Sequence, residues 1–199
     1  MTESRRYWRM ALAISAAIVA SSSLAGGQAA KAKAKKASAP FRLSAPDLVT
    51  KGRIDVSHAY NGMGCTGQNI SPALNWSNPP AGTKSFAVTM YDPDAPTGSG
   101  WWHWVMYNIP ATVTGLTAGA GNGRNAPRGS AEGPTDFSKK EYGGPCPPVG
   151  DKPHHYHITV FALKTDKLDI PGNATPAFVG YNLNANKLGK ASVTGLFAR

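Results

Sequence analysis

The side chains able to carry chemistry gather in two stretches of this sequence. In the first, residues 86–110, an apolar run ends on Asp92 and Asp94, and His103 precedes the next apolar run. Because successive side chains of an extended chain point to opposite sides, Asp92 and Asp94 are expected on the same side. The pattern predicts two carboxylates at the end of one strand and a histidine at the start of the next.

The second stretch, residues 143–157, passes through a proline-rich segment into a group of histidines. By the same alternation, His154 and Tyr156 share one face of an extended chain, and His155 and His157 share the other. Imidazole and phenol groups supply hydrogen-bond donors to phosphate oxygens, and histidine gains a positive charge when an anion lies close. These residue types favour a binding site for an anionic ligand.

Other interpretations of the same residues stay open. Asp-Pro and Pro-Thr-Gly are common in surface turns, and both histidine positions could be satisfied by Asp92 and Asp94 without any ligand. Two aspartates and two histidines could also hold a divalent metal that activates water, although they come from separate loops. A serine hydrolase is disfavoured because the GxSxG motif is absent. We expect no enzymatic activity, no metal and no cofactor.

Several motifs resemble, in their order and spacing, those of the phosphatidylethanolamine-binding protein family. The closer resemblance is to its bacterial YbhB/YbcL, or Raf-kinase-inhibitor-like, branch. It covers about residues 41–199, and several ordered motifs are more specific than any single one. The motifs are DPDAP (92–96), WWHWVMYNIP (101–110), GPCPP (144–148), HHYHITVFAL (154–163), CTGQNISPALNW (65–76) and GYNLNANKLGKA (180–191).

The resemblance implies a mainly β fold in one domain over residues 41–199: a two-sheet antiparallel β-sandwich with a few peripheral helices. It also implies a pocket for a phosphate-bearing ligand, such as a phospholipid head group or a phosphorylated group. The residues that it assigns to the pocket are Asp92, Asp94, His103, Pro148, His154 and Tyr156.

The two cysteines, Cys65 and Cys146, are the full complement of the sequence. The resemblance places Cys146 in the proline motif beside the pocket and Cys65 in a loop that can reach it. In an exported protein a bridge between them would form and persist. Two buried free thiols are the alternative, because an even number of cysteines proves little.

Local patterns predict one helix over residues 177–188, with Thr175 as its N-cap, Pro176 in its first turn and Gly189 at its end. Residues 111–153 form a long irregular run, which in a compact domain is usually functional or locally folded. Short runs of β-branched and aromatic residues predict the strands. These cover residues 41–47, 53–56, 74–76, 85–91, 104–109, 158–163 and 191–197.

The N-terminal residues have the composition of an export signal. A basic start (residues 1–9) precedes an apolar run (10–20) and a zone of small residues (21–30), which is the order of a secretory signal peptide. The apolar run is shorter than the roughly 20 residues that cross a bilayer, although an uncleaved anchor is the alternative. Residues 31–40 read as a Lys/Ala-rich linker. We expect a periplasmic or secreted protein.

The chain has 21 Lys and Arg residues against 11 Asp and Glu residues. Much of that excess lies in residues 1–40, so the domain lacks the basic stripe that a nucleic-acid-binding protein presents. The expected partner is a small phosphate-bearing ligand or lipid head group. The alternative is an interaction protein that inhibits or modulates a partner kinase or protease, and a homodimer is compatible with the sequence.

Overall fold

The computed structural model describes residues 39–50 and 52–199. The predicted signal peptide and nearly all of the predicted linker therefore lie outside the described residues. No helix within the described ranges has both the length and the apolar character needed to cross a membrane.

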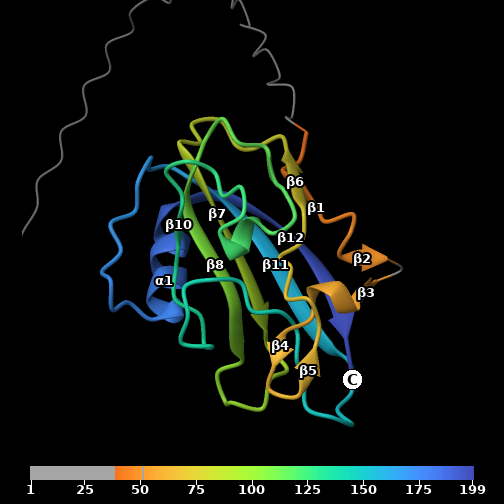
Figure 1. Cartoon of the computed structure of the whole chain (residues 1–199). Helices are drawn as coiled ribbons and strands as arrows, with labels where there is room; N and C mark the ends of the chain where they lie inside the picture. Colours follow the sequence, from red (N-terminus) through yellow and green to blue (C-terminus); the bar gives the residue numbers. More distant parts are fainter. Residues whose placement is uncertain (1–38, 51) are drawn as a thin grey trace, which may run out of the picture. The chain divides into compact units, whose positions relative to one another are not determined.

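Seven strands form the large sheet, in the order β10-β8-β7-β11-β12-β3-β2 (Figure 1). Neighbouring strands are antiparallel except β12 and β3, which run parallel with Leu196 opposite Arg53. This short parallel pair is the one departure from the predicted antiparallel β-sandwich among the described strands. The strands are β10 (Ala131–Glu132), β8 (Trp101–Pro110), β7 (Ser85–Asp92), β11 (His154–Leu163), β12 (Lys187–Phe197), β3 (Arg53–Ile54) and β2 (Val49–Thr50).

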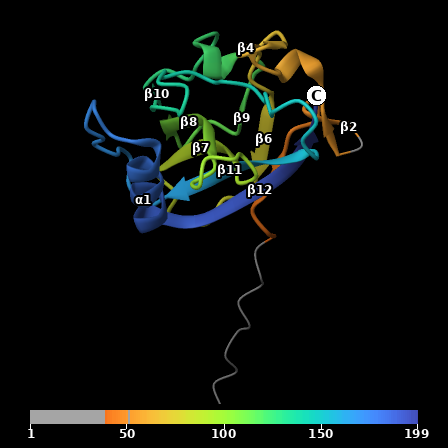
Figure 2. The ribbon, with the colours of Figure 1, turned by 90° about the horizontal axis from the view of Figure 1, so that it is seen from below.

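A smaller sheet packs on one face of the large one and completes a sandwich (Figure 2). Its order is β1 (Arg42–Ser44), β6 (Leu74–Ser77) and β9 (Gly115–Leu116). Trp76 of β6 meets Phe86 of β7 with 5.2 Å between ring centroids. A separate hairpin joins β4 (Asn61–Gly62) to β5 (Cys65–Thr66). The mainly β fold is confirmed.

The central strands of the large sheet are buried on both faces. On β7, Val88 and Met90 belong to the core between the sheets, whereas Ala87 faces the helix α1 (Pro176–Asn186). Val179 of that helix is fully buried against the sheet. Burying a side chain of this size stabilises a protein by roughly 1.5–3 kcal/mol. The sheet is therefore packed between two apolar layers.

The start of α1 is as predicted, but its end is not. The Thr175 hydroxyl accepts the Phe178 N–H at 3.2 Å, and proline occupies the first turn. The helix ends at Asn186 because Lys187 is already extended and pairs with β11. Gly189 lies inside β12, where a Cβ would approach Pro80 to 2.8 Å. Its role is close packing, not helix termination.

Other boundaries also differ from the predicted ones. β1 is shorter than predicted, whereas β8 and β11 begin earlier, at Trp101 and His154. The run 111–153 contains β9, β10 and a 3-10 turn, so it is locally folded. Tyr142 anchors it: the ring is fully buried and the hydroxyl donates to the His58 carbonyl at 2.9 Å.

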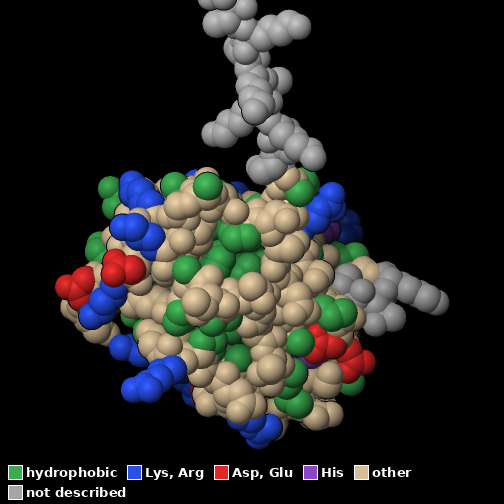
Figure 3. All heavy atoms as spheres, turned by 90° about the horizontal axis from the view of Figure 1, so that it is seen from above, with side chains coloured by type: hydrophobic (Ala, Val, Ile, Leu, Met, Phe, Trp, Pro, Cys, Tyr) green, Lys and Arg blue, Asp and Glu red, His purple; other side chains and the backbone are tan. Residues whose placement is uncertain are grey.

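One face of the domain shows how the charged groups are spread. Seen from above, apolar side chains lie across its middle, and Lys and Arg side chains lie around its edge (Figure 3). The basic residues of this face therefore form no single patch.

Candidate functional site

A pocket of about 200 Å³ opens where β7 ends and where β8 and β11 begin. Residues 143–150, here called the wall loop, close one side of it. Five of the six predicted site residues line this pocket. They are Asp92, His103, Pro148, His154 and Tyr156, and most of the remaining lining is apolar: Met63, Trp101, Phe137, Cys146 and Pro147, with residues 95–97.

Strand alternation explains how the sheet places three of these residues. Asp92 follows Met90 on the core face of β7, and Tyr156 precedes Ile158 on the core face of β11. His154 lies one further step along the same row. The polar base of the pocket is thus a continuation of the rows that form the apolar core.

His103 reaches the pocket through an irregularity of β8. Met90 pairs with Trp104 and Tyr91 pairs with Trp102, which leaves His103 without a partner on β7. A bulge of this kind redirects a side chain. The His103 ring centroid lies 5.2 Å from that of Tyr156, on the core side, whereas Trp102 packs toward α1.

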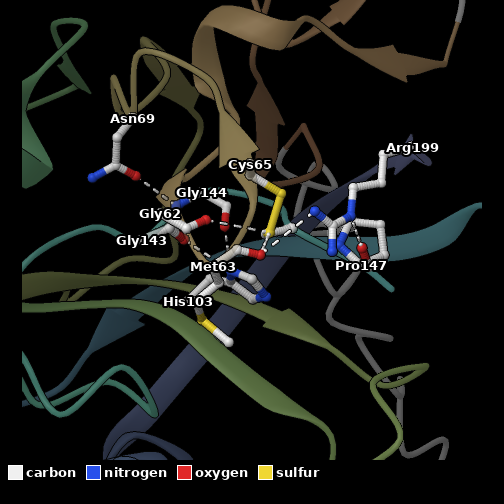
Figure 4. Close-up of a disulfide and its surroundings, with 10 residues drawn as sticks. Gly62, Met63, Cys65, Asn69, His103, Gly143, Gly144, Pro147 and Arg199 are labelled. Atoms are coloured by element: carbon white, nitrogen blue, oxygen red, sulfur yellow. Dashed lines mark hydrogen bonds between the residues drawn. A yellow bond between two sulfur atoms is a disulfide. The ribbon is translucent and has the colours of Figure 1, made fainter. Parts of the chain in front are cut away.

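The wall loop fixes the tautomer of His103. Its Nδ1 lies 2.8 Å from the Gly143 oxygen and 3.1 Å from the Gly144 oxygen (Figure 4). Both carbonyls are acceptors, so Nδ1 carries the hydrogen and Nε2 of the neutral ring keeps its lone pair. Burial lowers the pKa of His103 to about 4, although the carbonyls and Asp92 act in the opposite direction. His103 is therefore neutral at pH 7.

His154 is held between two carboxylates. Its Nδ1 lies 2.8 Å from Asp92 Oδ2, and its Nε2 lies 3.3 Å from Asp151 Oδ2. Burial lowers the pKa of His154, but the bond to Asp92, its charge and the bond to Asp151 outweigh that effect and raise it. Both ring nitrogens of His154 are engaged, and the second oxygen of Asp92 accepts the Asp94 N–H at 2.8 Å.

Tyr156 is fully buried, and its hydroxyl has no hydrogen-bond partner among the described residues. Burial raises its pKa, and so do the charge and the adjacent side chain of Asp92, so the phenol keeps its proton. Buried polar groups almost always have a partner. The hydroxyl of Tyr156 is thus a donor available to a ligand or to water.

Asp94 is the predicted pocket residue that lies elsewhere. Its carboxylate accepts the His155 backbone N–H and contacts His155 Nδ1, each at 2.7 Å. These two bonds lower the pKa of Asp94. β7 stops at Asp92, so alternation no longer applies beyond Pro93. The prediction that Asp92 and Asp94 share a side is wrong.

The predicted faces of β11 are confirmed. His154 and Tyr156 are buried, whereas His155 is exposed and bonds to Asp94. His157 Nδ1 lies 2.8 Å from Thr194 Oγ1 on β12. The alternative in which Asp92 and Asp94 satisfy both pocket histidines is wrong for His103, which bonds to wall-loop carbonyls instead.

The bridge between Cys65 and Cys146 is confirmed, with 5.9 Å between the Cα atoms (Figure 4). It joins β5 to the wall loop. Arg199 supports the same loop, because its Nε donates to the Pro147 carbonyl at 2.6 Å. The alternative of two free thiols is wrong.

Two residues that sequence reasoning missed hold the wall loop in place. Asn69 Oδ1 accepts the Gly144 N–H at 2.8 Å, and its amide group donates to the Tyr142 carbonyl at 3.2 Å. A Cβ at Gly144 would lie 2.0 Å from the His58 oxygen, so only glycine fits. The partners of Asn69 are more than 70 positions away, and no local pattern identifies them.

The side chains that could bind a metal ion are the last feature of the site, in the part of the chain that the structure describes. Residues 39–50 and 52–199 contain no group of three or more His, Cys, Asp and Glu side chains arranged to hold an ion.

Two packed sheets with a pocket at the ends of the central strands define a β-sandwich protein with a site of small-molecule size. Residues 44–198 match the sequence profile of the family described as phosphatidylethanolamine-binding protein. The chain belongs to this family.

Relatives of this chain include two proteins of Escherichia coli strain K12. YbcL is 52% identical over 161 residues, which cover 80% of this chain and 88% of YbcL. YbhB is 48% identical over 159 residues, covering 79% of this chain and all of YbhB. The crystal structure of YbcL, titled a new member of the mammalian PEBP family, has a TM-score of 0.78 and covers 81% of this chain and 99% of that one.

A more distant relative comes from Mycobacterium tuberculosis strain H37Rv. LppC, named as a candidate lipoprotein, is 31% identical over 163 residues, which cover 81% of this chain and 74% of LppC.

Proposed function

We propose that this protein binds a phosphate-bearing ligand in the pocket and does not chemically transform it. The observation that carries the proposal is the buried, unpaired hydroxyl of Tyr156 at the base of the pocket. It offers a hydrogen bond that nothing in the described chain takes. A phosphate oxygen is a suitable acceptor, and the family description names a phosphate-containing lipid.

The volume of the pocket favours a small group. About 200 Å³ accommodates a phosphate with a short substituent, such as a lipid head group, but not a lipid chain. Three prolines of the wall loop, Pro145, Pro147 and Pro148, keep the site stiff. A preorganised site loses less entropy on binding.

The nucleophiles near the pocket support a binding role. The sulfur of Cys146, which lines the pocket, is bonded to Cys65 and is not a thiol. The Thr97 hydroxyl donates to the Gly100 carbonyl. Nucleophilic catalysis requires a hydroxyl or thiol activated by an adjacent base, and neither group has one.

Replacing Tyr156 with phenylalanine should weaken binding of inorganic phosphate and of phosphoethanolamine by about tenfold or more. A hydrogen bond to a charged group contributes roughly 1.5–3 kcal/mol, and Tyr156→Phe removes that bond without leaving a cavity. Isothermal titration calorimetry measures the loss. Thermal unfolding should show that the variant is folded, so that the lost affinity is not a loss of structure.

His155→Ala is the matched control for this measurement. His155 is next to Tyr156 in sequence but faces outward and contacts Asp94. Its affinity for phosphate should equal that of the wild type. An equal loss in both variants, or no binding of any phosphate compound by the wild type, contradicts the proposed function.

We also propose that the chain is exported and that residues 1–24 are removed. The support is the signal-like N-terminus, the disulfide, which persists in oxidising compartments, and the name of LppC. Intact-mass analysis of periplasmic material should give a chain that starts between Gly26 and Ser38. A full-length cytoplasmic protein would contradict export.

A further inference from the structure

We propose that the pocket selects the singly protonated form of a phosphomonoester. In this arrangement His103 Nε2 accepts the hydrogen of a ligand P–O–H group, and the Tyr156 hydroxyl donates to a second phosphate oxygen. The inference rests on the proposed function and names the ligand class of the same site.

The histidines of the pocket have no hydrogen-bond donor free for an anion. The N–H of His103 donates to the carbonyls of Gly143 and Gly144. One ring nitrogen of His154 is bonded to Asp92 and the other to Asp151. Neither histidine therefore has a free N–H for an anion. The unpaired buried donors of the described pocket lining are the Tyr156 hydroxyl and the Trp101 Nε1–H, and neither belongs to a histidine.

Three lining positions and two wall-loop glycines offer no free backbone donor. Proline has no N–H, and Pro96, Pro147 and Pro148 all line the pocket. In the neighbouring wall loop, the N–H of Gly143 is bonded to the His103 carbonyl and that of Gly144 to Asn69. Backbone N–H groups at these positions do not replace the missing histidine donors.

The pocket contains a free hydrogen-bond acceptor and a buried carboxylate. The ring of His103 lines the pocket, and its Nε2 has a lone pair with no partner in the described chain. The Asp92 carboxylate also lines the pocket and is 2% exposed. A phosphate dianion would face this buried carboxylate, and His154, the basic side chain that the described structure places beside Asp92, has both ring nitrogens bonded to carboxylates. A like charge at such a site is unfavourable.

A phosphomonoester monoanion fits both the hydrogen-bonding groups of the pocket and its buried negative charge. It carries one P–O–H donor for His103, acceptor oxygens for Tyr156, and one charge instead of two. A phosphodiester has no P–O–H, and a fully ionised monoester has lost it. A site built to bond a ligand hydroxyl rejects analogues that lack it, because its own polar group stays unpaired.

The titratable groups that face His103 come from two neighbouring strands. Asp92 lies on β7, and His154 and Tyr156 lie on β11, with Asp151 bonded to His154 from outside the pocket. Tyr156 keeps its proton over the tested range. Any change at His154 affects all monoanions alike, so a ligand that does not titrate can measure it.

The experiment compares methyl phosphate with methyl sulfate by calorimetry between pH 5 and pH 8. Both are singly charged at pH 5 and similar in shape, but only methyl phosphate has an O–H. It should bind at least tenfold more tightly at pH 5. A second phosphate pKa of about 6 makes its apparent affinity fall about a hundredfold by pH 8. The affinity of methyl sulfate should change little, and dimethyl phosphate should behave like methyl sulfate.

The possible outcomes are distinct. Equal binding of methyl phosphate and methyl sulfate, or tighter binding at higher pH, overturns the inference while the proposed function stands. Nitrogen NMR of labelled protein gives a further test: His103 Nε2 should stay unprotonated in the complex, and a doubly protonated ring overturns the inference. Failure of inorganic phosphate and all three esters to bind overturns both.

Discussion

Loss of the Cys65–Cys146 bridge is expected to lower the free energy of unfolding by about 4.5 kcal/mol. The bridge joins residues 81 positions apart, and in the chain-entropy model a loop of that length restricts the unfolded chain by about this amount. For a domain of about 160 residues, the melting temperature should fall by roughly 9–18 °C. Urea unfolding of oxidised and reduced wild-type protein measures the difference.

A variant with both cysteines changed to serine separates the bond from the reductant. Cys65→Ser with Cys146→Ser should unfold like reduced wild type, and adding reductant should not change it further. Because Cys146 lines the pocket, phosphate affinity of this variant should fall as well. A stability loss below about 1 kcal/mol in both cases would show that the wall loop is held mainly by noncovalent contacts.

Acidification from pH 6.5 to pH 4 should cost about 3 kcal/mol of stability through His103 alone. The pKa of His103 is lowered to about 4 by burial in the folded state, whereas an unfolded chain takes up this proton near pH 6.5. Between these values the unfolded state binds more protons, so stability falls as pH falls. Below the pKa of His103 in the folded state, this residue no longer makes stability depend on pH.

Replacing His103 with glutamine removes the titrating group, so the stability difference between wild type and variant should change by about 3 kcal/mol between pH 6.5 and pH 4. Burial raises the pKa of Glu132 to about 8, which makes stability rise as pH falls over this range, but Glu132 is present in both proteins and cancels in the difference. Slopes against pH are compared, because the substitution also changes the absolute stability. His154 does not obscure the result: its pKa is raised, so its stabilisation is complete below about pH 6.5 and declines only as pH rises through the folded value. Parallel curves for wild type and His103→Gln between pH 4 and pH 6.5 would refute the assignment.

Sequence patterns predicted the parts of the fold that depend on local chemistry. Alternation placed His154 and Tyr156 on one face and His155 on the other, as observed. The cap at Thr175 also follows from residues next to one another. Gly189 was misassigned because its function depends on Pro80, which lies on a distant turn. The conformational preferences of neighbouring residues carry no information about that contact.

The limits of prediction at the candidate site have the same origin. The resemblance to a known family brought Asp92 and His103 together, but not how they bond. Alternation failed at Asp94, because the strand ends two residues before it, at Asp92. The tautomer of His103 depends on carbonyls of Gly143 and Gly144, 40 residues away. That contact reverses the expectation that this histidine donates to a phosphate.

The position of the pocket at the end of the core rows limits how ligand preference can diverge. Asp92 and Tyr156 stand in line with Met90 and Ile158, so changes there disturb the packing of the sheets as well as the ligand. The wall loop and the β4–β5 hairpin carry no such double role, because they reach the pocket from outside the large sheet. New specificities are therefore accessible mainly through residues such as Met63 and Pro148, while the sheet supplies a common base.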